Sequence, residues 1–178
     1  TPKATTFMPV VHLFASGHND EVKRLKIYFD KNVYKAKARN VYLTTSDISK
    51  IRTSSGAHVK SENTIQTNTL YLDSSSGSSI KIYVNADEIT SESSSGSSIQ
   101  IFGKTNIFSA NSSSGSSIDA DELTCFEAYA NASSGANINV NVSHKLTASA
   151  SSGGDIDFEG NPKNVNKDTS SGGSVSGN

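Results

Sequence analysis

Several residue types that define common protein classes are scarce in this 178-residue chain. A single cysteine, Cys125, excludes an internal disulfide and a metal site made only of cysteines. Tryptophan is absent, which removes the commonest aromatic platform for sugars. No apolar run approaches the roughly 20 residues that a membrane-spanning helix needs. Leucine, isoleucine, valine and phenylalanine total only 38 residues, a fraction close to that of disordered proteins.

Serine is abundant where apolar residues are scarce. The chain contains 33 serines, and together with glycine they make its second half resemble a flexible linker. The formal net charge of -1 argues against disorder, because disordered chains usually combine low hydrophobicity with strong self-repulsion. Composition alone therefore leaves the class open, and the order of the residues has to decide it.

A repeat runs through most of the chain. Seven segments share the form Ser-Ser-Gly, then a small residue, a polar residue and isoleucine or valine, and their glycines are 18 to 21 residues apart. These glycines are Gly56, Gly77, Gly96, Gly115, Gly135, Gly153 and Gly172. A random polar linker would not keep this spacing, so the sequence predicts a repeat architecture.

The apolar residues keep one parity relative to these glycines. Three positions after each glycine stands a β-branched residue in all seven repeats: Val59, Ile80, Ile99, Ile118, Ile138, Ile156 and Val175. Other apolar residues recur five positions after the glycines and five and seven positions before them. Because odd offsets share one face of an extended chain, these residues predict a continuous strip facing a narrow core.

The same parity predicts how the serine motif turns. The small residue after each glycine and the serine directly before it are expected to point inward, the serine hydroxyl bonding nearby backbone. The glycine is expected to supply the unusual backbone angles of the bend. The serines two positions before the glycines are expected to face outward as a stacked row: Ser54, Ser75, Ser94, Ser113, Ser133, Ser151 and Ser170.

These patterns predict an all-β protein, a single-stranded right-handed parallel β-helix with about 19 residues per coil. Residues 51–178 form its coils. Residues 1–50 break the period and are expected to form irregular N-terminal strands that cap the same domain, with strands at 7–15, 22–30 and 40–45. At the other end the last coil carries no bulky cap, so self-association through it is one expectation.

Charge is uneven along the chain. Residues 1–60 carry a net charge of +7, and residues 61–178 carry -8. The basic run comprises Lys23, Arg24, Lys26, Lys31, Lys35, Lys37 and Arg39. No nucleic-acid motif accompanies it, so we interpret these residues as the outward positions of alternating strands, with Leu25, Ile27 and Phe29 pointing inward.

Several segments resemble a known family. They are Leu25-Lys-Ile-Tyr, Asn40-Val-Tyr-Leu-Thr-Thr, Ile48-Ser-Lys-Ile, Glu159-Gly-Asn-Pro-Lys and the serial Ser-Ser-Gly repeats. Over residues 22–178 the chain resembles the head GIN domain of putative auto-transporter adhesins, exported domains of unknown function found mainly in Bacteroidetes-type bacteria. The resemblance implies a right-handed β-helix and a location in the cell envelope or outside the cell, and it supplies no mechanism.

Acidic residues are the candidates for an enzymatic site. Parallel β-helices often act on polysaccharides, and such chemistry needs clustered carboxylates. The first suspects are Asp87 and Glu88, with Asp121 and Glu122 two coils further on. The intervening coil places Lys104-Thr105-Asn106 at the corresponding position, so the acids are not expected to stack. A second acidic run, Asp155, Asp157 and Glu159, has even offsets and is expected on the surface.

The remaining candidates favour structural roles. Gly103-Lys104-Thr105 resembles the end of a phosphate-binding loop but lacks the required upstream glycine, because Ser98 stands there. The histidines His12, His18, His58 and His144 show no metal-ligand spacing. Cys125 lies beside Phe126 and is expected to be buried and inert. We therefore predict no catalytic, cofactor-binding or metal-binding residues.

The leading hypothesis is a non-enzymatic, exported β-helix domain of the cell envelope that serves adhesion, scaffolding or glycan contact. A cell-surface glycan or an envelope protein would be its partner, with no nucleic acid and no membrane span. The alternative is a polysaccharide-active lyase or hydrolase that uses the surface carboxylates. Convergence of at least two suspect carboxylates in a groove, within the ~10 Å typical of glycosidase pairs, would favour the enzyme.

Overall fold

The computed structural model describes residues 10–16, 22–28, 40–45 and 47–177, and for residues 10–16 and 22–24 it describes the backbone only. These residues form strands and connecting turns without any helix. The strands are β1 (Val10–Ser16), β2 (Val22–Tyr28), β3 (Lys50–Ser54), β4 (His58–Lys60), β5 (Ile65–Ser74), β6 (Ser79–Ser93), β7 (Ser98–Ser112), β8 (Ser117–Ser133), β9 (Asn137–Ser151), β10 (Asp155–Glu159), β11 (Asn164–Thr169) and β12 (Ser174–Gly177).

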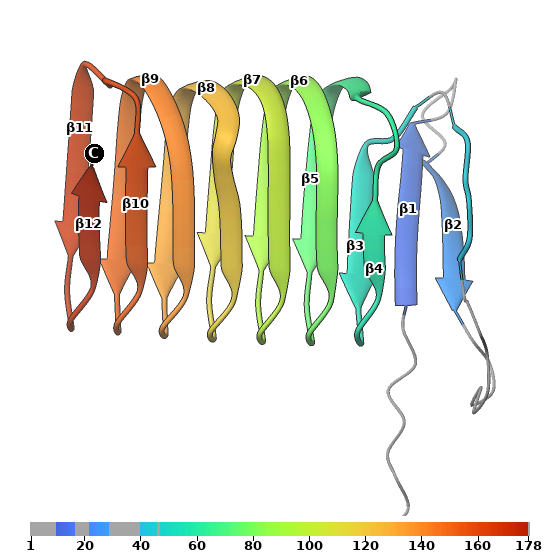
Figure 1. Cartoon of the computed structure of the whole chain (residues 1–178), viewed down its shortest axis with the longest axis horizontal. Coiled ribbons are helices and arrows are strands. Elements are labelled where there is room, and N and C mark those ends of the chain that lie inside the picture. The colour runs from blue at the N-terminus through green and yellow to red at the C-terminus, as the bar shows by residue number, and fades with distance from the viewer. Residues whose placement is uncertain (1–9, 17–21, 29–39, 46, 178) are drawn as a thin grey trace, which may run out of the picture.

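The strands wind into a solenoid of about seven turns, as the sequence predicts (Figure 1). A parallel stack runs along the solenoid in the order β3, β5, β6, β7, β8, β9, β10 and β12, in which each strand pairs with the next one named. Ile80 pairs with Ile99, which pairs with Ile118, so equivalent repeat positions lie on top of one another. The repeat of about 19 residues therefore corresponds to one coil. The right-handed sense of the path stays a prediction.

A narrow apolar core runs along the solenoid axis. The β-branched residues three positions after the glycines are fully buried in the central coils, and Leu72, Ala110 and Ala148 form a second inward row. Burying one large aliphatic side chain contributes about 1.5–3 kcal/mol. Because every coil adds such side chains to the same strip, a chain poor in apolar residues still builds a continuous core.

The turn between coils differs from the sequence expectation in one respect. The serine before each glycine does not point inward, because this serine and the glycine both have positive φ. At Ser95 and Gly96 the φ angles are 55° and 68°, and the N–H of Ser97 donates to the carbonyl of Ser94 at 3.3 Å. Two positive φ angles with such a closing bond are typical of a type I′ turn. Ser95 is therefore an exposed tip.

Buried hydroxyls line the inside of this turn. The inward residues lie three positions before and one position after the glycine, as in the pair Ser93 and Ser97, whose hydroxyl oxygens are 2.9 Å apart. The Ser97 hydroxyl lies 2.6 Å from the Ser74 carbonyl oxygen of the preceding coil and 2.7 Å from that of Ser94. Buried polar groups are tolerated when they are bonded in this way. The expectation of small inward residues after the glycines is confirmed for most coils.

The N-terminal strands add an antiparallel edge to the solenoid. β1 pairs antiparallel with β3 on one side and with β2 on the other, so strands are confirmed within 7–15 and 22–30. The strand expected at 40–45 is wrong, because this exposed segment pairs with no described strand. The division at residue 50 into cap and coils stays a proposal.

The basic run falls mostly outside the description. Only Lys26 is described with its side chain, which is exposed and lies 4.6 Å from the ring centroid of Tyr28. Leu25, which was expected to point inward, is 43% exposed, so the inward phase of β2 is wrong at this residue. The side chains of Lys23 and Arg24, and the residues 29–39 that contain Phe29 and the other four basic residues, lie outside the described part.

Lys167 occupies an inward position in the last coil. It pairs in register with buried Ala148, yet its ammonium lies 4.6 Å from the ring centroid of Phe158 and donates to the carbonyl of Val175 at 3.2 Å. A second copy stacked on this coil would bury this charge at a high cost. Inward charges are one way in which sheet edges avoid pairing with other copies.

The turn geometry predicts opposite effects of two substitutions at Ser95. Asparagine tolerates positive φ better than serine, so Ser95→Asn should raise the free energy of unfolding by up to about 1 kcal/mol. Ser95→Val should lower it by about 1–2 kcal/mol, because a β-branched residue is strained there. Urea denaturation measures both. Ser98→Val, on the adjoining strand, is the matched control and should change the free energy of unfolding by less than about 0.5 kcal/mol. Equal effects of valine at positions 95 and 98 would contradict the turn assignment.

The position of Lys167 predicts that it prevents end-to-end association of this chain. Lys167→Leu should give a species whose sedimentation coefficient rises with concentration, because an apolar core end is then exposed. Lys163→Leu removes the same charge from an exposed turn and should sediment like the unsubstituted chain. A Lys167→Leu variant that stays monomeric at high concentration would overturn this role.

Candidate functional site

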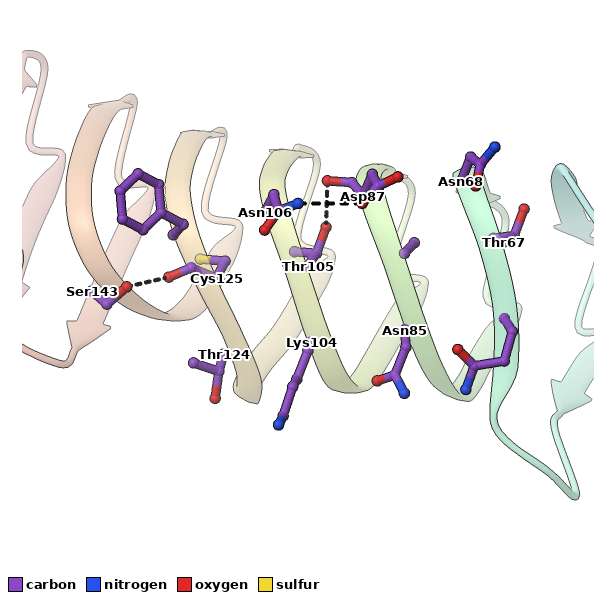
Figure 2. Close-up of a pocket in the computed structure, with 13 residues that line it drawn as sticks. Thr67, Asn68, Asn85, Asp87, Lys104, Thr105, Asn106, Thr124, Cys125 and Ser143 are labelled. Atoms are coloured by element: carbon purple, nitrogen blue, oxygen red, sulfur yellow. Dashed lines mark hydrogen bonds between the residues drawn. The ribbon is translucent and has the colours of Figure 1, made fainter.

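A groove of about 770 Å³ crosses strands β5 to β9 on the outside of the solenoid (Figure 2). Two rows of side chains form its walls, and the backbone of the row between them forms its floor. The first wall contains Gln66, Asn85, Lys104 and Thr124; the second contains Asn68, Asp87, Asn106 and Phe126; the floor contains Thr67, Ala86, Thr105 and Cys125. Ser143 closes the groove on β9.

The parallel register builds these rows. Gln66 pairs with Asn85, Asn85 with Lys104, and Lys104 with Thr124, so four successive strands contribute one side chain each to the first wall. Neighbouring strands lie about 4.8 Å apart, and five strands give the groove a length of about 19 Å. The groove therefore runs along the solenoid axis and perpendicular to the strands.

Hydrogen bonds between coils hold the second wall and the floor in place. Asn106 Nδ2 donates to Asp87 Oδ1 at 3.2 Å, and the Thr105 hydroxyl lies 3.2 Å from the Asp87 carbonyl oxygen (Figure 2). The Ser143 hydroxyl donates to the carbonyl of Cys125 at 3.1 Å. These bonds link side chains to rigid strands, so the groove keeps its shape without a ligand.

The groove is polar and almost neutral. Asp87 and Lys104 are its only charged lining residues, and they lie on opposite walls. The other polar residues of the lining carry amide or hydroxyl groups, each of which can donate and accept hydrogen bonds. Such a lining has no charge excess that would select a polyanion or a polycation.

An aromatic pair lies at one end of the groove. The rings of Phe126 and His144 stack with centroids 4.5 Å apart and an interplanar angle of 7°. Phe126 is 50% exposed, so part of its ring remains accessible beside the amides of the second wall. A second stacked pair, Tyr83 and Phe102, lies outside the groove, with centroids 4.8 Å apart.

The four suspect acids do not meet in the groove. Asp87 lines it, whereas Glu88, Asp121 and Glu122 are exposed residues outside its lining. The reason is an insertion in β8. The pairing with β7 shifts between Gln100 and Gly103, and Asp121 and Glu122 fall within this irregular stretch. The expectation that the acids do not stack directly agrees with this register.

The other sequence candidates have structural contacts. Asp157 and Glu159 are exposed on β10, as expected, and Asp157 accepts a bond from the Ser176 hydroxyl, whereas Asp155 is half-buried. Gly103, Lys104 and Thr105 lie within strand β7 instead of a phosphate-binding loop. His58 Nδ1 is 2.6 Å from the Ser79 hydroxyl. His18 and the side chain of His12 lie outside the described residues.

Among the described residues, no group of three or more histidine, cysteine, aspartate or glutamate side chains could hold a metal ion. Nor does that part of the chain contain a helix with the length and hydropathy needed to cross a membrane.

Cys125 is buried beneath the groove, as expected. The thiol is 1% exposed, its Sγ donates to the carbonyl of Asn141 at 3.1 Å, and burial raises its pKa to about 12. A thiolate is the reactive form of cysteine. Cys125 therefore contributes to the floor of the groove and not to nucleophilic chemistry.

The stacked serine row offers less surface than expected. The serines two positions before the glycines are half-buried in six of the seven coils, although some of them border a second, smaller hollow of about 310 Å³. Beside that hollow, Asn131 Nδ2 donates to Asn111 Oδ1 at 3.0 Å. Arg52 Nε pairs with Asp73 Oδ2 at 2.7 Å on the same outer face. This face is a ladder of polar side chains, several of which bond to a neighbouring coil.

Sequence reasoning missed the amides of the groove. Gln66 and Asn85 lie eleven positions before the next glycine, and Asn68 and Asn106 lie nine positions before it. The two members of each row lie at different distances from the preceding repeat glycine, because the segment between that glycine and the groove varies in length. Counting backward from the following glycine would have aligned them.

The family model described as "Putative auto-transporter adhesin, head GIN domain" matches residues 19–162. No curated protein matches the chain in sequence. A crystal structure of a putative adhesin from Bacteroides fragilis is similar, with a TM-score of 0.75 and 16% identity over 93% of this chain and 76% of that chain. A putative lipid binding protein from Parabacteroides distasonis gives a TM-score of 0.57 and 14% identity over 96% and 84%. At such identities, these two likenesses show the fold alone.

The burial of Cys125 predicts that its thiol is unreactive in the native protein. At pH 8 almost none of it is ionised, and the neighbouring coils cover it. A chromogenic disulfide reagent should give no signal with the folded chain and one thiol per chain after denaturation in guanidinium chloride. Rapid modification of the folded chain would contradict the closed floor of the groove.

Proposed function

Because the chain belongs to the head GIN domain family of putative auto-transporter adhesins, we propose that it is an exported, surface-associated domain that adheres to a partner without catalysing a reaction. The groove along β5 to β9 is its binding surface. The adhesin description of the family and the adhesin-like fold support this role.

The composition of the groove carries the proposal. Glycosidases need two carboxylates that flank the reacting bond, about 5–10 Å apart. Among the lining residues of this groove only Asp87 is acidic, and its Oδ1 already accepts a hydrogen bond from Asn106. The rest of the lining offers hydrogen bonds in a regular order. This arrangement favours recognition over bond cleavage.

The rigidity of the walls also favours binding. The groove residues stand on paired strands of a continuous sheet, and hydrogen bonds already hold Asp87, Asn106 and Thr105. Such residues lose little conformational entropy when a partner binds. Extended surfaces of stacked repeats are used widely for binding elongated partners. The groove therefore combines a large contact area with little need for rearrangement.

Display of the domain on a non-adherent bacterial strain tests this proposal. Cells carrying it should be retained on surfaces coated with mucin, with whole bacterial envelopes or with extracted polysaccharide, on at least one of the three. The double variant Asn85→Ala/Asn106→Ala should lose most of this retention. The matched double variant Asn111→Ala/Asn131→Ala changes the same residue type outside the groove and should keep it. Failure of the unsubstituted domain to adhere to all three surfaces would overturn the proposal.

Catalysis is tested on the same polysaccharides. Prolonged incubation with the purified domain should release neither new reducing ends nor unsaturated uronate, since the groove holds a single carboxylate. Release that disappears in an Asp87→Asn variant would instead identify an enzyme with Asp87 as its acid or base.

A further inference from the structure

The geometry of the groove points to a specific class of partner. We propose that the groove binds a neutral, unbranched glycan chain that lies parallel to the solenoid axis, with about one sugar unit for each coil. This inference rests on the proposed adhesive function and names its ligand. It follows from the spacing of the walls, their chemistry and the aromatic pair at one end.

The spacing of the walls fits a linear glycan. Each coil adds one residue to either wall, and successive residues are about 4.8 Å apart. This distance is comparable to the advance of one hexose in an extended chain. A ligand with that repeat meets one side chain of each wall on each of the strands β5 to β8, as a branched or globular ligand cannot. The length of about 19 Å accommodates about four or five sugar units.

The chemistry of the walls fits hydroxyl groups. Asn85 on the first wall and Asn106 on the second each carry an amide with two donor hydrogens and an acceptor oxygen. Gln66 and Asn68 repeat this pattern on β5. Sugar hydroxyls also donate and accept, so an amide can bond adjacent hydroxyls of one ring. Thr124 adds a hydroxyl of its own.

Charge and backbone pairing argue against other elongated ligands. The opposite charges of Asp87 and Lys104 leave no net field for a sulfated or uronic acid polymer, or for a nucleic acid. A peptide that adds a strand needs a free sheet edge. Strands β6, β7 and β8 are paired with neighbours on both sides at the groove, so they offer none. Over Ile65–Thr69, β5 pairs only with β6, so its free edge lies at the end of the groove and not along it.

Phe126 gives the groove a defined end. The Phe126 ring is stacked on His144, which fixes the orientation of the ring. Half of the surface of Phe126 is exposed beside the amides of the second wall. The apolar CH face of a sugar ring packs well against an aromatic ring. Phe126 is therefore expected to hold the sugar at the β8 end of the groove, whereas the amides bind the sugars that precede it.

A glycan array followed by titration calorimetry tests the proposal. The purified chain is applied to an array of neutral and acidic glycans, and binding neutral chains are then titrated as a series from disaccharide to octasaccharide. Affinity should rise with length up to four or five sugars and then stay constant. Asn85→Ala/Asn106→Ala and, separately, Phe126→Ala should each weaken binding about tenfold or more. Asn111→Ala/Asn131→Ala should leave it unchanged, and equal melting temperatures exclude misfolding.

Three outcomes would overturn this inference. They are binding to no neutral glycan on the array, preference for acidic glycans, and binding that the groove variants do not alter. If displayed cells still adhere through the groove but soluble neutral glycans fail to compete, the adhesive function stands and the glycan assignment falls, leaving a protein partner. If the displayed cells do not adhere at all, the proposed function itself falls.

Discussion

A Ser-Gly pair with two positive φ angles closes each coil, and the rest of the structure depends on it. The turn reverses the chain over few residues, and its tip bonds to the tip of the next coil, as in the 3.1 Å bond from the Gly77 N–H to the Ser95 carbonyl. Because successive coils close at the same place, Ile80 and Ile99 remain in register. The walls of the groove lie on a different part of each coil. They are aligned because this turn keeps successive coils in register.

The turn also explains the unusual composition. A solenoid core is only one coil wide, so each repeat needs only a few large side chains to exclude water from it. At the corner the chain bends too tightly for such residues, and serine fills the space while its hydroxyl bonds the carbonyl groups that the bend exposes. In later coils, alanine or glycine takes the place of these serines, as at Ala136 and Gly154. At Gly154 an added Cβ would clash with the carbonyl group of Ala132.

The fold was predictable because its signal is repeated seven times in the sequence. Each β-branched residue after a glycine adds to the same inference, and errors at one coil do not change it. Features that occur once were harder to predict. The outward position of Ser95 follows only if both turn residues have positive φ. The insertion in β8 moves Asp121 and Glu122 out of register. Residues 40–45 have the β-propensity of a strand but pair with no described strand. Predicting the groove from the sequence would have required aligning coils of unequal length in their correct register.

The groove of this solenoid favours binding over catalysis for an electrostatic reason. Residues at one position lie about 4.8 Å apart in successive coils, so two carboxylates in one row repel each other. The groove avoids this by placing Asn106 next to Asp87, where an amide donates a hydrogen bond instead of adding a second charge. On the outer face, Asp73 lies between Arg52, with which it forms an ion pair, and Glu92, which accepts a hydrogen bond from the Tyr71 hydroxyl. The lining of the groove is therefore polar and nearly neutral, and successive coils contribute to it at a regular spacing. Those properties suit a ligand that is itself polar, neutral and periodic.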